Sequence, residues 1–142
     1  MEENQSALTI ITYKDRMTRH YHGLSKNNEK EILQFLYKNG IQFGKIHMQE
    51  SHDIGDTDYY TGHIDGYENL MQSKAFEHLY GEWTIIASYN DVEIVIDKQY
   101  PNICHGISFR YQKSEDGRLA PIFKKFEKKF CYKDIRFWRE DR

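Results

Sequence analysis

The sequence lacks the features that most often reveal where a protein acts. Its two cysteines, Cys104 and Cys131, have no C-x-x-C spacing, and no apolar run approaches the roughly 18 residues of a transmembrane helix. The start, MEENQSALTIITYKDR, has neither the basic nor the apolar region of a signal peptide. We therefore expect a cytoplasmic protein without a membrane partner. Its two thiols fit a reducing compartment, and a disulfide between them stays open.

Familiar catalytic and metal-binding motifs are lacking as well. The sequence contains no G-x-S-x-G motif, and neither cysteine has neighbours that would activate it as a nucleophile. The segment 50–65, ESHDIGDTDYYTGHID, collects carboxylates and histidines of the kinds that coordinate divalent cations. Its order differs from that of an EF-hand loop, so we expect a solvated acidic loop. The sequence thus predicts no catalytic residue, no metal site and no cofactor.

What is present predicts one α+β domain over residues 1–142. A hydrophobic content of 39% and an aromatic content of 15% suffice for the core of a domain of this length. The expected architecture is an antiparallel sheet with a central three-strand meander at about 82–111. Two to three amphipathic helices are expected to cover one face of this sheet.

The expected meander has a regular alternation of apolar and polar residues. A two-residue turn at Asn90-Asp91 would place Ala87 opposite Ile94. His105 would then lie on the apolar face, toward the helices. The other face would carry the polar members of these strands, namely Glu93, Asp97, Ser108 and Arg110.

The helices are predicted from their capping residues and apolar stripes. Residues 28–31 read N-x-x-E, a capping box that begins a first helix. Apolar spacing predicts a second helix at about 67–80 and a third at about 121–131, with Pro121 in the first turn. The stretch 14–22, KDRMTRHYH, is expected to be a polar connection, and the tail 132–138 a short strand.

Charge is distributed unevenly along the chain. The segment 43–100 contains eleven acidic and three basic residues, whereas the segment 122–142 contains eight basic and four acidic residues. The acidic middle would repel a polyanion, so we do not expect nucleic-acid binding. The same segment would attract a basic protein partner through its electric field.

These features favour a non-catalytic binding protein that neutralises another macromolecule. An immunity protein, or another inhibitor of a toxin or nuclease, would fit. A small reduced chain without catalytic motifs is typical of such bacterial or phage inhibitors. The predicted contact residues are Glu50, Asp53, Asp56, Asp58, Glu93, Asp97 and Arg110.

The alternative is a binder of, or an enzyme acting on, a nucleotide or another phosphorylated small molecule. Its cationic contacts would come from Arg16, Arg19, His20 and His22. No glycine-rich loop accompanies these residues, which favours an exposed polar connection instead. A homodimer formed through the apolar side of an edge strand is compatible with either hypothesis.

Overall fold

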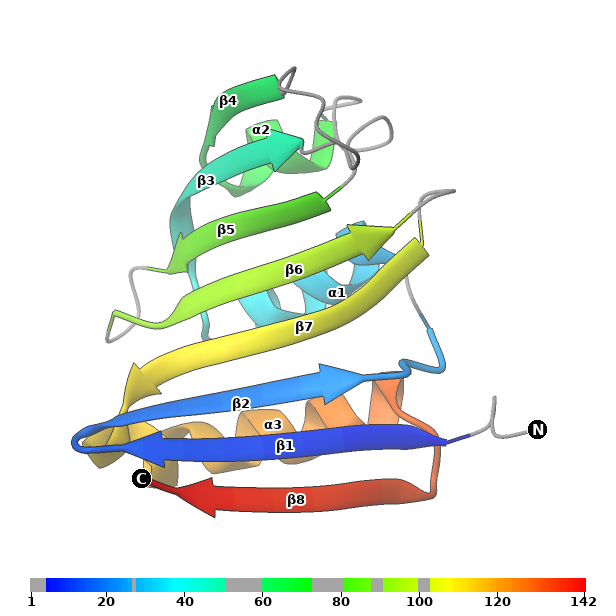
Figure 1. The fold of residues 1–142 in the computed structure, drawn as a ribbon. Helices are drawn as coiled ribbons and strands as arrows, with labels where there is room; N and C mark the ends of the chain where they lie inside the picture. The colour runs from blue at the N-terminus through cyan, green and yellow to red at the C-terminus, as the bar shows by residue number, and fades with distance from the viewer. Residues whose placement is uncertain (1–4, 27, 51–59, 73–80, 88–90, 100–102) are drawn as a thin grey trace, which may run out of the picture.

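The computed structural model describes residues 5–26, 28–50, 60–72, 81–87, 91–99 and 103–142. Within these ranges the chain forms eight strands, three α-helices and one short 3-10 helix (Figure 1). The strands are β1 (Ser6–Tyr13), β2 (Arg16–His22), β3 (Phe43–Glu50), β4 (Tyr60–Asp65), β5 (Gly81–Ala87), β6 (Glu93–Gln99), β7 (Ile103–Gln112) and β8 (Ile135–Asp141). The helices are α1 (Glu29–Lys38), α2 (Tyr67–Gln72), η2 (Lys113–Glu115) and α3 (Asp116–Phe130).

The eight strands form one mixed sheet in the order β4-β3-β5-β6-β7-β2-β1-β8. The predicted α+β class is confirmed. The expectation of a wholly antiparallel sheet is wrong at one edge, where β8 pairs parallel to β1. The reason is that α3 carries the chain back along the sheet after β7, so β8 runs in the same direction as β7 and β1.

One face of the sheet contributes to the hydrophobic core. Figure 1 shows α1 and α3 on the same side of the sheet. The core joins alternate residues of the strands to the apolar sides of these helices. Its largest fully buried side chains are Tyr21, Tyr111, Phe109, Phe123, Phe126, Phe130, Ile32, Leu33 and Leu36. We call the opposite side of the sheet the open face.

The pairing of β5 with β6 differs from the predicted register by two residues. Ile85 lies opposite Ile94, and the Ala87 N–H donates to the Val92 carbonyl at 2.8 Å. The loop between the strands is therefore longer than the predicted two-residue turn. A shift of two residues keeps every side chain on its predicted face, since faces alternate with a period of two. Ile85, Ala87, Val92 and Ile94 are accordingly buried.

The predicted polar connection at 14–22 is instead the hairpin strand β2, which is a correction. Lys14 adopts a φ of 56° in the turn after β1, and β2 then pairs with β1 on one side and β7 on the other. Met17 and Tyr21 are buried on the core side, while Thr18 and His20 alternate with them. The segment was predicted as a connection because most of its residues are polar, although its alternate residues face the core.

The observed helices agree with the prediction at the start of α1 and differ from it at the start of α3. The Asn28 side chain accepts from the Glu31 N–H at 3.0 Å, so the predicted capping interaction is confirmed. α3 begins at Asp116, five residues before the predicted start, and contains Pro121 within its length. A proline there costs one helical hydrogen bond, but the buried aromatic stripe of α3 favours the continuous helix. The predicted helix at 67–80 is observed as α2, and residues 73–80 lie outside the described ranges.

Within the described part of the chain, none of the helices combines the length and apolar character that crossing a bilayer requires.

Candidate functional site

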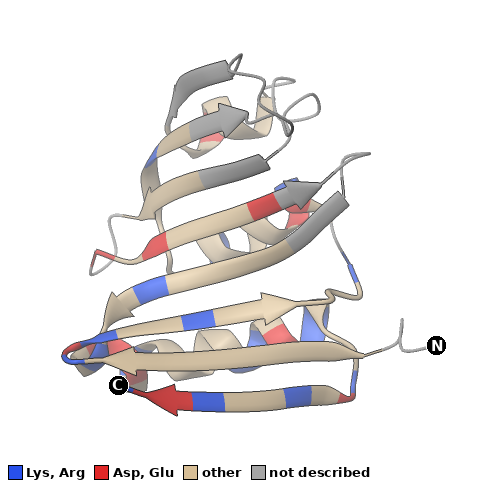
Figure 2. Cartoon of the chain, in the orientation of Figure 1, with Lys and Arg blue, Asp and Glu red and all other residues tan. Residues whose placement is uncertain are grey.

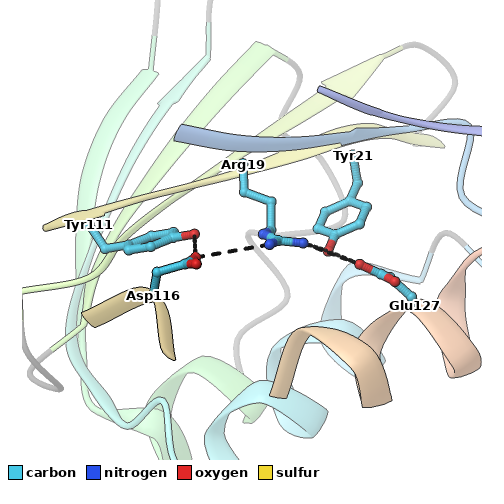
Figure 3. Close-up of polar contacts among 5 residues, drawn as sticks. All are labelled: Arg19, Tyr21, Tyr111, Asp116 and Glu127. Carbon is cyan, nitrogen blue, oxygen red and sulfur yellow. Dashed lines mark hydrogen bonds and ion pairs between the residues drawn. The ribbon is translucent and has the colours of Figure 1, made fainter. Parts of the chain in front are cut away.

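A partly buried polar network joins α3 to strands β2 and β7 (Figure 3). Arg19 Nη1 donates to Tyr21 Oη at 3.1 Å and to Glu127 Oε2 at 3.3 Å, and Tyr21 Oη donates to the same Glu127 oxygen at 2.5 Å. At the other end Tyr111 Oη donates to Asp116 Oδ1 at 2.7 Å, and Arg19 Nη2 lies 4.0 Å from that oxygen. One guanidinium thus bridges two carboxylates of α3, which fixes the helix against β2 and β7.

Both phenols of this network stay protonated at neutral pH. Burial and the hydrogen bond to Asp116 together raise the pKa of Tyr111 to about 12, against the opposing effect of Arg19. Burial also raises the pKa of Tyr21 far above its ordinary value, with Glu127 adding to the shift and Arg19 opposing it. The two hydroxyls therefore remain donors to the carboxylates of α3 at neutral pH.

A cavity of about 290 Å³ lies beside the network, between α3 and strands β1, β2 and β8. It is lined by Leu8, Ile10, Arg19, Ala120, Phe123, Lys124, Glu127, Ile135 and Phe137. Its walls are mainly apolar. The Arg19 guanidinium stacks 4.5 Å from the centre of the Phe123 ring and donates to Glu127. This cation is already neutralised, so the cavity suits an apolar group better than a phosphate.

The open face is crossed by rows of directly opposed residues, which the strand registers define. One row runs through Lys45, Ile86, Glu93, Arg110, Thr18, Ile11 and Glu140. Within it Arg110 Nη1 lies 3.2 Å from Glu93 Oε1. Ile86 is opposite Glu93, and its side chain is 54% exposed. This part of the open face thus presents a large apolar side chain beside an ion pair.

A second row contains a hydrogen-bonded pair of a histidine and a serine. His20 Nδ1 lies 2.7 Å from Ser108 Oγ, and the His20 ring stacks on His22 at 6.5 Å. Gly106 makes room for this ring, because a Cβ there would lie 3.1 Å from His20 Cε1 and 2.9 Å from the Tyr21 carbonyl oxygen. Backbone N–H groups of β7 point sideways toward β6 and β2, not above Ser108. Within the described parts of β6, β7 and β2, no backbone N–H is therefore placed to stabilise an oxyanion above Ser108.

The structure brings together residues that the sequence assigned to two different hypotheses. Glu93, Asp97 and Arg110 share the open face with Arg16, His20 and His22, as the registers of β6, β7 and β2 require. Figure 2 shows the two acidic bands of β6 on this sheet. Arg19 alternates with its neighbours and lies on the opposite face, in the partly buried network. The four cationic residues of the phosphate hypothesis therefore do not form one cluster.

The other residues predicted to contact a partner have side chains outside the described part of the chain. Glu50 is the last residue of β3, and its side chain is not among those that the structure describes. Asp53, Asp56 and Asp58 lie outside the described residues, as does the side chain of His105. Among the described residues, no three histidine, cysteine, aspartate or glutamate side chains come together as a metal site.

Several important residues were not anticipated from the sequence. The exposed aromatic side chains Tyr13, Phe137 and Trp138 lie on β1 and β8, at one end of the strand order. Glu127, in the basic stretch of α3, is the acceptor for both Arg19 and Tyr21. The alternation of Met17, Arg19 and Tyr21 was the available signal for β2.

Comparison of the chain with protein-family models, with curated proteins and with solved structures gives no match. Functional inference therefore starts from the surface itself.

Proposed function

We propose that the protein is a non-catalytic binding protein that neutralises another macromolecule, as an immunity protein or another inhibitor of a toxin or nuclease does. The open face is the proposed contact surface. The observation that carries this proposal is Ile86, exposed on a sheet face beside the Glu93–Arg110 ion pair. Large apolar side chains surrounded by charged ones are typical of protein interfaces.

The charge distribution supports a basic protein partner. The strands that surround Ile86 belong to the segment 43–100, in which acidic residues outnumber basic ones by eleven to three. Glu93 and Asp97 project from β6 on the open face itself. A field of this sign accelerates the encounter with a basic surface, such as the substrate-binding surface of a nuclease.

The phosphorylated-ligand hypothesis has less support. Arg16, His20 and His22 share a face, but Arg19 is turned away and bound to Glu127. A flat sheet face also offers less burial to a small molecule than to a protein. The open face therefore suits a protein partner better than a small phosphorylated ligand.

Photo-crosslinking tests the proposed surface. A benzophenone amino acid is placed at Ile86, and a matched control carries it at Lys125, an exposed position on α3. After irradiation in a lysate of the source organism, we expect one stoichiometric protein adduct at position 86 and none at position 125. The purified captured protein should then lose its activity when one equivalent of this chain is added.

Two results would refute the proposal. Equal adducts at both positions would show that the open face has no special role. A captured protein whose activity is unaffected by the chain would refute neutralisation while leaving binding intact.

A further inference from the structure

Strand β8 is an edge strand with an unusual surface. It ends the strand order, and no described strand pairs with its outer side (Figure 1). Phe137 is 58% exposed and Trp138 is 63% exposed, on opposite sides of the sheet. The pairing of β8 with β1 is continuous over seven residues, without a bulge, and β8 contains no proline. Bulges and prolines are two of the features by which edge strands avoid association. Charged side chains are another, and β8 has four of them, at Arg136, Arg139, Glu140 and Asp141.

The hydrogen bonds to β1 show which backbone groups of β8 face outward. The Ser6 N–H donates to the Asp134 carbonyl, and the Arg142 N–H donates to the Thr12 carbonyl. Even-numbered residues of this segment therefore direct their backbone groups toward β1. Because the direction alternates along a strand, Ile135, Phe137, Arg139 and Asp141 direct theirs outward.

This alternation limits how two copies of β8 could pair about a two-fold axis. In an antiparallel pair, the residues whose backbone groups point outward on one strand lie opposite those on the other strand, so odd-numbered residues pair with odd-numbered ones. In every register that meets this condition, one residue lies on the two-fold axis, directly opposite the same residue of the partner. Centring on Arg136, Arg139, Glu140 or Asp141 would place like charges together, and centring on Phe137 would place Asp134 opposite the partner's Glu140. Centring on Ile135 would leave no other residue of the two strands paired.

Centring on Trp138 gives a register in which no like charges are directly opposed. Arg136 then lies opposite the partner's Glu140, and Asp134 opposite the partner's Arg142. Phe137 lies opposite the partner's Arg139, a combination suited to a cation–π contact. Each pairing occurs twice because of the two-fold axis. Figure 2 shows two basic bands along β8 and an acidic band at its C-terminal end, the arrangement that produces this complementarity.

We propose that β8 binds β8 of a second copy of this chain, antiparallel and with Trp138 opposite the partner's Trp138. The dimer joins two sheets edge to edge and covers the exposed edge of each. Glu140 already accepts from Arg142 Nε at 2.7 Å within its own chain, and the partner's Arg136 adds a second cation to the same carboxylate. The inference is independent of the open-face partner, because Ile86 lies on β5, five strands away from β8 in the sheet order.

Sedimentation equilibrium tests the dimer. The wild-type chain should have twice its monomer mass of 17.1 kDa. W138R should be monomeric, because it places two like charges at the two-fold axis. The control I86R makes the same kind of change at another exposed position of the open face and should remain dimeric. A wild-type monomer, or a dimer that W138R leaves intact, would overturn the proposal.

Charge exchange tests the register. R136E should weaken the dimer about thirtyfold, because two attractive pairs become repulsive. The double variant R136E/E140R restores opposite charges and should recover much of the loss. Equal dissociation constants for R136E and the wild-type chain would refute this register.

Disulfide trapping gives a second measurement on the same register. W138C should form a disulfide-linked dimer on oxidation, because directly opposed residues that are not hydrogen-bonded have Cα atoms about 4.5 Å apart. F137C lies opposite a different residue and should not be trapped. Equal trapping of both variants would contradict the register. Failure of the crosslinking at Ile86 would leave these results unchanged, so the two proposals fail separately.

Discussion

Replacing Arg19 with methionine should lower the free energy of unfolding by about 3 kcal/mol. The substitution keeps much of the aliphatic contact but leaves Glu127 and Asp116 without their shared cation. Removing one partner of a buried ion pair typically costs 3–5 kcal/mol, because the remaining charge stays poorly solvated. The lower end applies here, since the Glu127 side chain retains 24% exposure and that of Asp116 retains 38%. Urea denaturation followed by circular dichroism measures the change.

The matched control is Arg118→Met, on the same helix that Arg19 anchors. Arg118 Nε lies 3.8 Å from Glu115 Oε1, but its side chain is 65% exposed. Exposed pairs contribute little, so the control should change stability by less than about 0.5 kcal/mol. Equal effects of the two substitutions would show that the Arg19 network does not hold α3 to the sheet.

Replacing Phe126 with alanine should lower the free energy of unfolding by about 4 kcal/mol. Phe126 is fully buried at the centre of the aromatic core, with ring centres 5.0 Å from Tyr21, 5.7 Å from Phe109 and 5.1 Å from Phe130. Truncation removes the transfer free energy of the ring and leaves a cavity that neighbouring rings fill only in part. Denaturant unfolding again measures the loss.

Two companion variants make this result interpretable. Phe126→Leu retains most of the volume and should cost less than the alanine variant. Phe137→Ala removes a ring of the same kind from an exposed position of β8 and should cost little, when measured at a concentration where the chain is monomeric. A loss at Phe126 no larger than that at Phe137 would contradict the packing of α3 on the sheet.

Local signals predicted much of the fold. The Asn28 cap and the apolar alternation of β5, β6 and β7 depend on neighbours in sequence, and both describe the observed elements. The predictions failed where contacts between residues far apart in the sequence, rather than local patterns, determine the structure. β2 is polar by composition, yet pairing with β1 and β7 makes it a central strand. The parallel pairing of β1 with β8 joins the two ends of the chain, and no local pattern encodes it.

The candidate site was predictable only in part, for the same reason. The neighbourhood of Glu93 and Arg110 follows from strand alternation and is observed, with 3.2 Å between their charged groups. The position of Arg19 depends on a strand that was not predicted, so its contact with Glu127, 108 residues later, could not be anticipated. Strand alternation likewise places Ile86 on the same face as Glu93, where its side chain is 54% exposed.

The affinity of the captured protein for Ile86→Asp tests the open-face account most directly. The variant places a charge at the centre of the proposed interface, on an exposed side chain whose loss does not affect the core. Isothermal titration calorimetry should show a dissociation constant raised about 100-fold, as expected for the loss of a central contact. Lys125→Asp on α3 should bind like the wild-type chain. An Ile86→Asp variant that binds with unchanged affinity would contradict the account.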